Sequence, residues 1–154
     1  MIQRIQSVYL LLAVIAVSLL FFMPIADLLT NANQVFMFRY RGLYEIKDAK
    51  EILYMTSYPL AILLTLNVII SLITIFKYKN RPLQMRLCIL NIIFLLVSVI
   101  LGYIFIYITF AKLNPMVHFK ISAVMPLVAA VFTFMAYKGI QKDDKLVKSV
   151  DRIR

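Results

Sequence analysis

The chain has 154 residues, of which 63% are hydrophobic and 16% are charged, and its mean hydropathy is +0.89. A soluble domain is typically about half apolar and a quarter charged, so this composition excludes an ordinary water-soluble globule and indicates a membrane protein. The net charge of +10 comes from 17 Lys and Arg against 7 Asp and Glu. These basic residues lie between apolar segments, where they fix topology and meet anionic head groups, so we expect membrane lipids and no nucleic acid as partners.

The first apolar segment covers residues 8–29 and is either a cleaved export signal or a retained span. A signal has an apolar region of roughly 7 to 15 residues that ends at a site with small residues. Here the run from Val8 to Ala26 is longer, is apolar apart from Ser18, and leads into no such site. The sequence therefore predicts a retained first span.

Residues 30–57 form the expected outer loop. Between Gln34 and Ile46, aromatic residues recur at every second position, which is typical of a strand, and Gly42 is a natural break for a turn. We expect a small two-stranded hairpin, which is marginal alone in water and should lie against the helix ends or a partner. The candidate partner-facing residues of this loop are Phe38, Tyr40, Gly42, Leu43 and Tyr44.

Three further apolar segments, residues 58–76, 87–111 and 117–137, are each long enough to cross the hydrocarbon core, which takes about 20 residues. The short basic connection at residues 77–86 predicts a tight turn between antiparallel helices. The fold expected is therefore all-α: a single integral membrane domain of four transmembrane helices with a small β-hairpin in its first extracytoplasmic loop.

The loop charges give the orientation, because Lys and Arg near span ends are retained in the cytoplasm. With four spans, 11 basic residues lie on the side of the two termini and 6 on the other side. We therefore expect a multi-pass protein of the bacterial inner membrane with both termini cytoplasmic. The basic tail, residues 138–154, predicts an amphipathic helix on the inner leaflet after a break at Gly139, the alternative being a docking site for a cytoplasmic partner.

Polar side chains inside a bilayer are costly and need a partner or a purpose. Asn67 and Ser71 share one face of the second apolar segment, and Asn91 and Ser98 share one face of the third, at matching depths. We interpret these four residues as interhelical polar contacts, because no ionisable group joins them. The alternative is that they line a path for a polar substrate.

The residues for catalysis or metal binding are few. The single cysteine, Cys88, excludes an intramolecular disulfide, and the single histidine, His118, leaves no histidine pair for zinc. Three glycines provide no phosphate loop, and no acid and base share a helical face. We therefore expect no enzyme activity, no metal and no cofactor.

The opening MIQRIQSVYLLLAVIA, the four apolar segments, the aromatic outer loop and the basic tail resemble an uncharacterised family of four-span inner-membrane proteins from Bacteroidota, known as a domain of unknown function. The resemblance covers essentially the whole chain, and the MIQRIQ opening is its most specific part. It implies membership and location but no activity.

Two functions remain open from the sequence. The first is a non-catalytic accessory or assembly subunit of a larger envelope complex, which meets other membrane or envelope proteins through the aromatic outer loop. The second is a lipid-handling or small-solute transport protein that acts as an oligomer, because four short spans enclose little by themselves.

Overall fold

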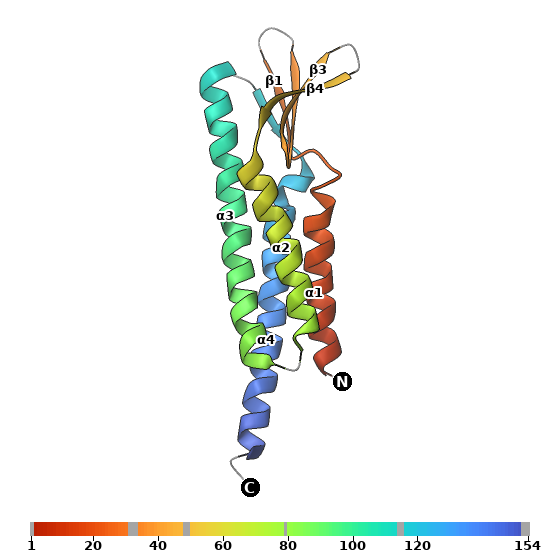
Figure 1. Cartoon of the computed structure of the whole chain (residues 1–154), viewed down its shortest axis with the longest axis vertical. Helices are drawn as coiled ribbons and strands as arrows, with labels where there is room; N and C mark the ends of the chain where they lie inside the picture. Colours follow the sequence, from red (N-terminus) through yellow and green to blue (C-terminus); the bar gives the residue numbers. More distant parts are fainter. Residues whose placement is uncertain (1, 31–33, 48–49, 79, 114–115, 152–154) are drawn as a thin grey trace.

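The computed structural model describes residues 2–30, 34–47, 50–78, 80–113 and 116–151, and places a bundle of helices below a β-sheet (Figure 1). Sequential helices run in opposite directions, so the start of the first helix and the end of the last lie at the end of the bundle away from the sheet. The helices of the described residues are α1 (Ile2–Leu19), α2 (Tyr58–Phe76), α3 (Arg81–Leu113), the short 3-10 helix η1 (Ile121–Val124) and α4 (Met125–Asp151).

The sheet has five antiparallel strands in the order β4-β3-β2-β1-β5. Its strands are β1 (Ala26–Leu29), β2 (Val35–Arg39), β3 (Gly42–Lys47), β4 (Lys50–Thr56) and β5 (Met116–Phe119). Strand β1 pairs on one side with β2, where Leu28 faces Phe36, and on the other side with β5, where Leu28 faces Val117. The sheet therefore joins the segment after α1 to the segment that connects α3 with α4.

The prediction of an all-α fold with one small hairpin is wrong, because the described residues include a five-stranded antiparallel sheet. Strand β1 lies at the end of the first apolar segment, residues 8–29, which was predicted to be one span. Helix α1 ends at Leu19, the next residues form tight turns, and Pro24 has no N–H with which a helix could continue. The chain then becomes extended because two strands, one of them far along the sequence, are available to pair with it.

The prediction of four membrane spans is also corrected. Three helical segments are long and apolar enough to cross a membrane, namely Tyr58–Phe76, Arg81–Thr109 and Ile121–Val147. The described apolar part of α1, Ile5–Leu19, is shorter than the roughly 20 residues that a crossing needs. The last span was expected to begin at residue 117, but residues 116–119 are strand β5. Helix α4 also continues through Gly139 to Asp151, so the tail begins as an extension of this helix.

The helices pack along seams of small, polar and apolar side chains that repeat at alternating spacings of four and three residues. This average of 3.5 residues is the repeat of a coiled-coil seam, which keeps one stripe of each helix turned toward its neighbours. In α2 the buried residues are Leu60, Leu64, Asn67, Ser71 and Thr74, and in α4 they include Ala129, Thr133, Ala136, Ile140 and Asp143.

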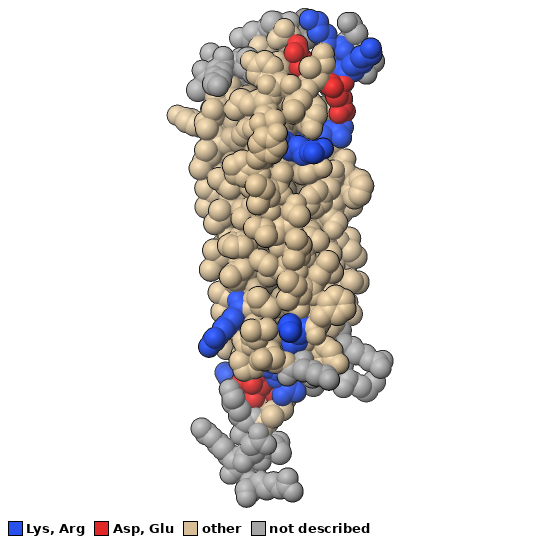
Figure 2. All heavy atoms as spheres, in the orientation of Figure 1, with Lys and Arg blue, Asp and Glu red and all other residues tan. Residues whose placement is uncertain are grey.

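The surface of the helices is apolar outside these seams. Figure 2 shows Lys, Arg, Asp and Glu gathered near the two ends of the molecule, with a broad uncharged band between them. Large apolar side chains are exposed around this band, for example Ile62, Ile100 and Val131. A contiguous apolar surface of this extent is unusual on a soluble monomer and matches a lipid-facing surface.

Candidate functional site

The first candidate site is the polar seam between α2 and α3. The Asn91 side-chain amide donates a hydrogen bond of 2.7 Å to the Ser71 hydroxyl, and both side chains are buried. Further from the sheet, seven residues before Asn91 on α3, the Gln84 side-chain amide donates a hydrogen bond of 3.1 Å to the backbone carbonyl of Thr74. Among the described residues, two side-chain hydrogen bonds therefore connect these helices, each from an amide of α3 to an oxygen of α2.

The other two predicted seam residues bond within their own helices. The Asn67 amide donates to the Leu63 carbonyl at 2.9 Å, and the Ser98 hydroxyl donates to the Leu95 carbonyl at 2.7 Å. All four predicted residues are buried at helix contacts, but among them only Asn91 and Ser71 share a hydrogen bond in the described part of the chain. Gln84 was not predicted, although its spacing of seven residues from Asn91 could have revealed it.

A second polar contact joins α1 to α4 at the end away from the sheet. The Gln6 side-chain amide donates a hydrogen bond of 2.6 Å to Asp143, and both residues are buried. A Cβ atom placed on Gly139, one turn before Asp143, would lie 3.0 Å from Cγ of Gln6. The absence of a side chain at position 139 therefore lets α1 approach α4 closely at Gln6, and the helix continues through this glycine.

The sheet turns one face toward the helices. Phe38 is fully buried and stacks on Phe105 of α3 with ring centroids 5.0 Å apart. Leu43, its partner on β3, is buried on the same face, and Gly42 beside it is also buried. Three of the five residues predicted to face a partner therefore lie inside the protein, because the aromatic face covers the helix ends.

The other two residues that were predicted to face a partner, Tyr40 and Tyr44, are partly exposed. Tyr40, in the turn between β2 and β3, is half-buried and makes an edge contact with Phe21 at 4.9 Å between centroids. Tyr44 is half-buried on the opposite face of the sheet. On that face Met37, which pairs with Tyr44, is also half-buried, so this face offers more open surface than the face that carries Phe38.

The most exposed part of the sheet is the edge strand β4. Its neighbour on one side is β3, and no described strand pairs with its other side. Ile52, Leu53 and Tyr54 are 52%, 48% and 51% exposed, which is a high exposure for three consecutive large side chains. An edge strand of this kind presents free backbone N–H and C=O groups beside apolar side chains and is a template for another strand.

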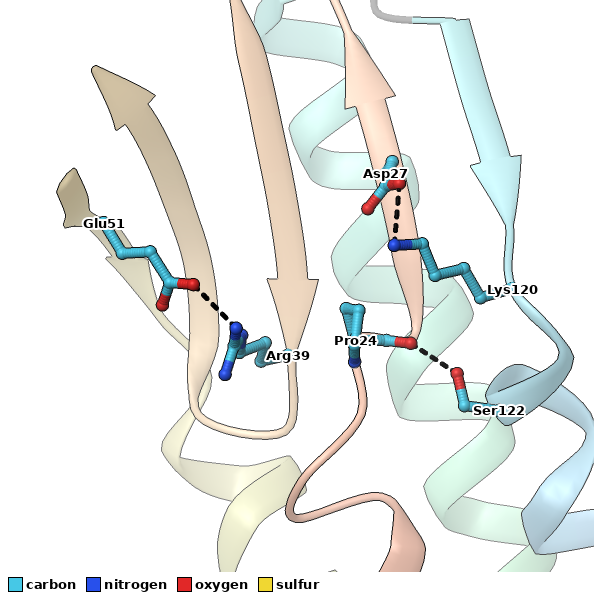
Figure 3. A network of polar contacts seen from close by, with 6 residues as sticks. All are labelled: Pro24, Asp27, Arg39, Glu51, Lys120 and Ser122. Carbon is cyan, nitrogen blue, oxygen red and sulfur yellow. Dashed lines mark hydrogen bonds and ion pairs between the residues drawn. The ribbon is translucent and has the colours of Figure 1, made fainter. Parts of the chain in front are cut away.

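Polar contacts fasten the sheet to the helices and its strands to one another (Figure 3). Asp27 of β1 forms an ion pair of 2.9 Å with Lys120, which follows β5. The Ser122 hydroxyl of η1 donates to the Pro24 carbonyl, just before β1. Across the other half of the sheet, Arg39 pairs with Glu51 at 2.6 Å.

An apolar cavity of about 120 Å³ lies between α2, α3 and the start of α4. Ser98 and Gly102 contribute to its lining, whereas Asn67 is not among its lining residues. Within the described residues, no three His, Cys, Asp or Glu side chains come together as a metal site would require.

Together these features define a class: a bundle of apolar helices, three of which could cross a membrane, carrying a five-stranded sheet at one end. The chain belongs to the family described as Domain of unknown function (DUF4293), whose model matches residues 2–153. The predicted membership of a family of unknown function is therefore confirmed. No curated protein matches the sequence.

Proposed function

We propose that this protein is a small multi-pass protein of the bacterial inner membrane that acts without catalysis, as an accessory or assembly subunit of an envelope complex. The uncharged band around the helices and the length of α2, α3 and α4 support the membrane location. The MIQRIQ opening supports a source in Bacteroidota.

We also propose that the sheet lies on the outer side of this membrane and that both ends of the chain are cytoplasmic. The start of α1 and the end of α4 lie at the same end of the bundle. That end also carries the short basic connection between α2 and α3, which includes Lys77, Arg81 and Arg86. Positive charge near helix ends favours the cytoplasmic side.

The exposed edge of β4 is the observation that carries the proposed role as a subunit. An extended segment of another protein could add to this edge, with backbone hydrogen bonds supplying affinity and side chains supplying specificity. Ile52 and Leu53 would then be covered by the partner. The partner is therefore a periplasmic segment of another envelope protein that presents a free strand.

Site-specific photocrosslinking in living cells tests this role. A photoreactive residue at Leu53, on the edge strand, should give discrete protein adducts that mass spectrometry can identify after mild detergent extraction. The matched position is Leu96 on α3, which is similarly exposed but faces lipid, and should give no protein adduct. Absence of protein adducts from Leu53 in several growth conditions would end the proposal.

The second candidate function is lipid handling or small-solute transport by an oligomer. The apolar cavity beside Ser98 and Gly102 favours it. At about 120 Å³ this cavity is smaller than the roughly 300 Å³ at the lower end of ligand pockets. Transport would therefore need a cavity shared between copies, which crosslinking of purified protein in vesicles would detect as a defined oligomer.

A further inference from the structure

A surface groove lies where the sheet meets the helices, between the β2–β3 turn and the first turns of α2. Its volume is about 490 Å³, within the range of ligand sites. Figure 2 shows basic side chains at this junction, at the edge of the uncharged band. The groove is lined by residues that include Phe21, Tyr40, Arg41, Tyr58, Ile62 and Leu66.

The turn that carries Arg41 is held in a fixed position over α2. The Arg41 carbonyl accepts a hydrogen bond of 2.7 Å from the backbone N–H of Ser57, directly before α2. The next residue, Gly42, has a φ of +151°, and a Cβ there would lie 2.1 Å from the Met55 carbonyl oxygen. On the other side of the turn, Tyr40 rests against Phe21. The groove is therefore preorganised by the backbone.

The charge in the groove is unbalanced. Arg41 is exposed, and no carboxylate in the described part of the chain forms an ion pair with it. Its neighbour Arg39 is different, because Glu51 neutralises it at 2.6 Å. A free guanidinium at the mouth of an apolar groove suits a phosphate group, which it can bind through two parallel hydrogen bonds.

The dimensions of the groove match one leaflet of a bilayer. Tyr58 stands beside Arg41 at the mouth, and a tyrosine in this position is typical of the membrane interface. Leu66 lies eight residues further along α2, a distance of about 12 Å at 1.5 Å per residue. The hydrocarbon of one leaflet is about 15 Å thick, half of the bilayer core.

We propose that this groove binds one anionic phospholipid of the outer leaflet. Its phosphate contacts Arg41, its ester region lies beside the two tyrosines at the mouth, and one acyl chain follows Ile62 and Leu66. The inference rests on the proposed membrane location and is independent of the partner proposed for β4. The bound lipid would fix the level at which the sheet stands above the bilayer.

Tryptophan quenching tests this site directly, because the chain contains no tryptophan. Ile62 is 60% exposed, so Ile62→Trp places a reporter in the groove without disturbing the core. The full-length variant is reconstituted in phosphatidylcholine vesicles that contain either brominated phosphatidylglycerol or brominated phosphatidylcholine. Quenching should give a binding constant for phosphatidylglycerol that is about fivefold higher, which corresponds to roughly 1 kcal/mol for one basic residue at an anionic surface.

A matched reporter controls for general enrichment of anionic lipid. Ile62 precedes Ser71 by nine residues, and Ile100 follows its bonded partner Asn91 by nine, so the two positions lie at the same depth. Ile100 is similarly exposed but lies outside the groove lining. Ile100→Trp should therefore report equal binding of the two lipids.

Charge variants in the Ile62→Trp background identify the binding group. Arg41→Gln should make the binding constants of phosphatidylglycerol and phosphatidylcholine about equal. Arg41→Lys should retain most of the preference for phosphatidylglycerol. Lys50→Gln, which removes another exposed basic residue of the sheet, should leave the preference unchanged. Equal quenching of the Ile62→Trp reporter by both lipids would overturn the lipid site. A preference for phosphatidylglycerol that survives Arg41→Gln would overturn it as well. If neither brominated lipid quenches either reporter, the helices lie outside the bilayer and the proposed membrane location fails as well.

Discussion

Asn91 of α3 donates its side-chain hydrogen bond to Ser71 of α2 over 2.7 Å, and the two residues are almost completely shielded from the surroundings. In the proposed membrane location neither group has water as an alternative partner, so we expect the bond to fix the lengthwise register of the two helices. The Gln84 contact to the Thr74 carbonyl supports the same register further from the sheet: at 1.5 Å per residue, Gln84 lies about 10 Å from Asn91 along α3, and Thr74 lies about 5 Å from Ser71 along α2.

We expect Ser71→Ala to destabilise the bundle by about 0.5–2 kcal/mol, because the Asn91 amide then loses its acceptor. Unfolding of detergent-solubilised protein by titration with a denaturing detergent measures this change. Thr65→Ala is the control, because the Thr65 hydroxyl is exposed and bonds within α2. In the double variant with Asn91→Leu, the loss should be smaller than the sum of the single losses; strict additivity would show that the bond contributes no coupling.

The two helical glycines should respond in opposite ways to added side chains. Gly139→Leu should cost about 1–3 kcal/mol, because its Cβ already meets Gln6 at 3.0 Å and the larger side chain separates α1 from α4. A Cβ at Gly102 meets nothing within 4 Å, so Gly102→Ala should be neutral or stabilising. The same denaturation assay compares the two, and equal effects would contradict the close contact of α1 with α4.

The turn that begins β3 should tolerate no side chain at Gly42. Gly42→Ala is expected to cost about 1–3 kcal/mol, because alanine combines a disfavoured positive φ with a clash against the Met55 carbonyl. The loss should be local, so amide hydrogen exchange should accelerate in β3 and β4 before it changes in α3. Unchanged protection of these strands would show that the turn has a different conformation.

The orientation of the protein can be measured with single cysteines in a Cys88→Ser background. Gln34→Cys, at the outer sheet, should react with a membrane-impermeant maleimide in cells whose outer membrane has been permeabilised. Ser149→Cys, near the end of α4, should react after the inner membrane is also broken. Both positions are exposed, so access and not burial decides the result. Reaction of position 149 in intact inner membranes would reverse the proposed topology.

The helices were the more predictable part of the fold. Residues 58–76 were expected as a span and coincide with α2, and the third segment, residues 87–111, lies inside α3. A long apolar run predicts a membrane-spanning helix from its own length and composition, without any knowledge of the segments that pack against it. The tight turn between these helices was also predictable, from the short basic sequence of residues 77–86.

The sheet was not predictable to the same degree, because the pairing of β1 with the edge strand β5 joins distant segments. Residues 26–29 are extended because residues 116–119 and 35–39 pair with them, and their own sequence, Ala-Asp-Leu-Leu, contains no alternation that would predict a strand. The alternation in β2 showed that Phe36 and Phe38 share a face. It did not show that this face is turned inward, since α3 supplies the covering surface through Phe105.

The candidate site was predicted in part for a similar reason. The spacing of Asn67, Ser71, Asn91 and Ser98 placed them on facing stripes, but spacing alone does not determine which of them exchange hydrogen bonds. The contact between Gln6 and Asp143 was not visible either, because these residues lie in segments 137 positions apart that meet when α1 packs on α4.

The pairing of β1 with β5 gives the chain a defined order of assembly. A ribosome completes β1 to β4 before α2 emerges, so four strands can pair while the later helices are still being made. Strand β5 becomes available when α3 is complete, and its addition closes a loop of nearly ninety residues with the high contact order that slows folding. Completion of the sheet therefore requires that α2 and α3 have already been synthesised, and until then β1 has an open edge that a quality-control protease or chaperone could recognise.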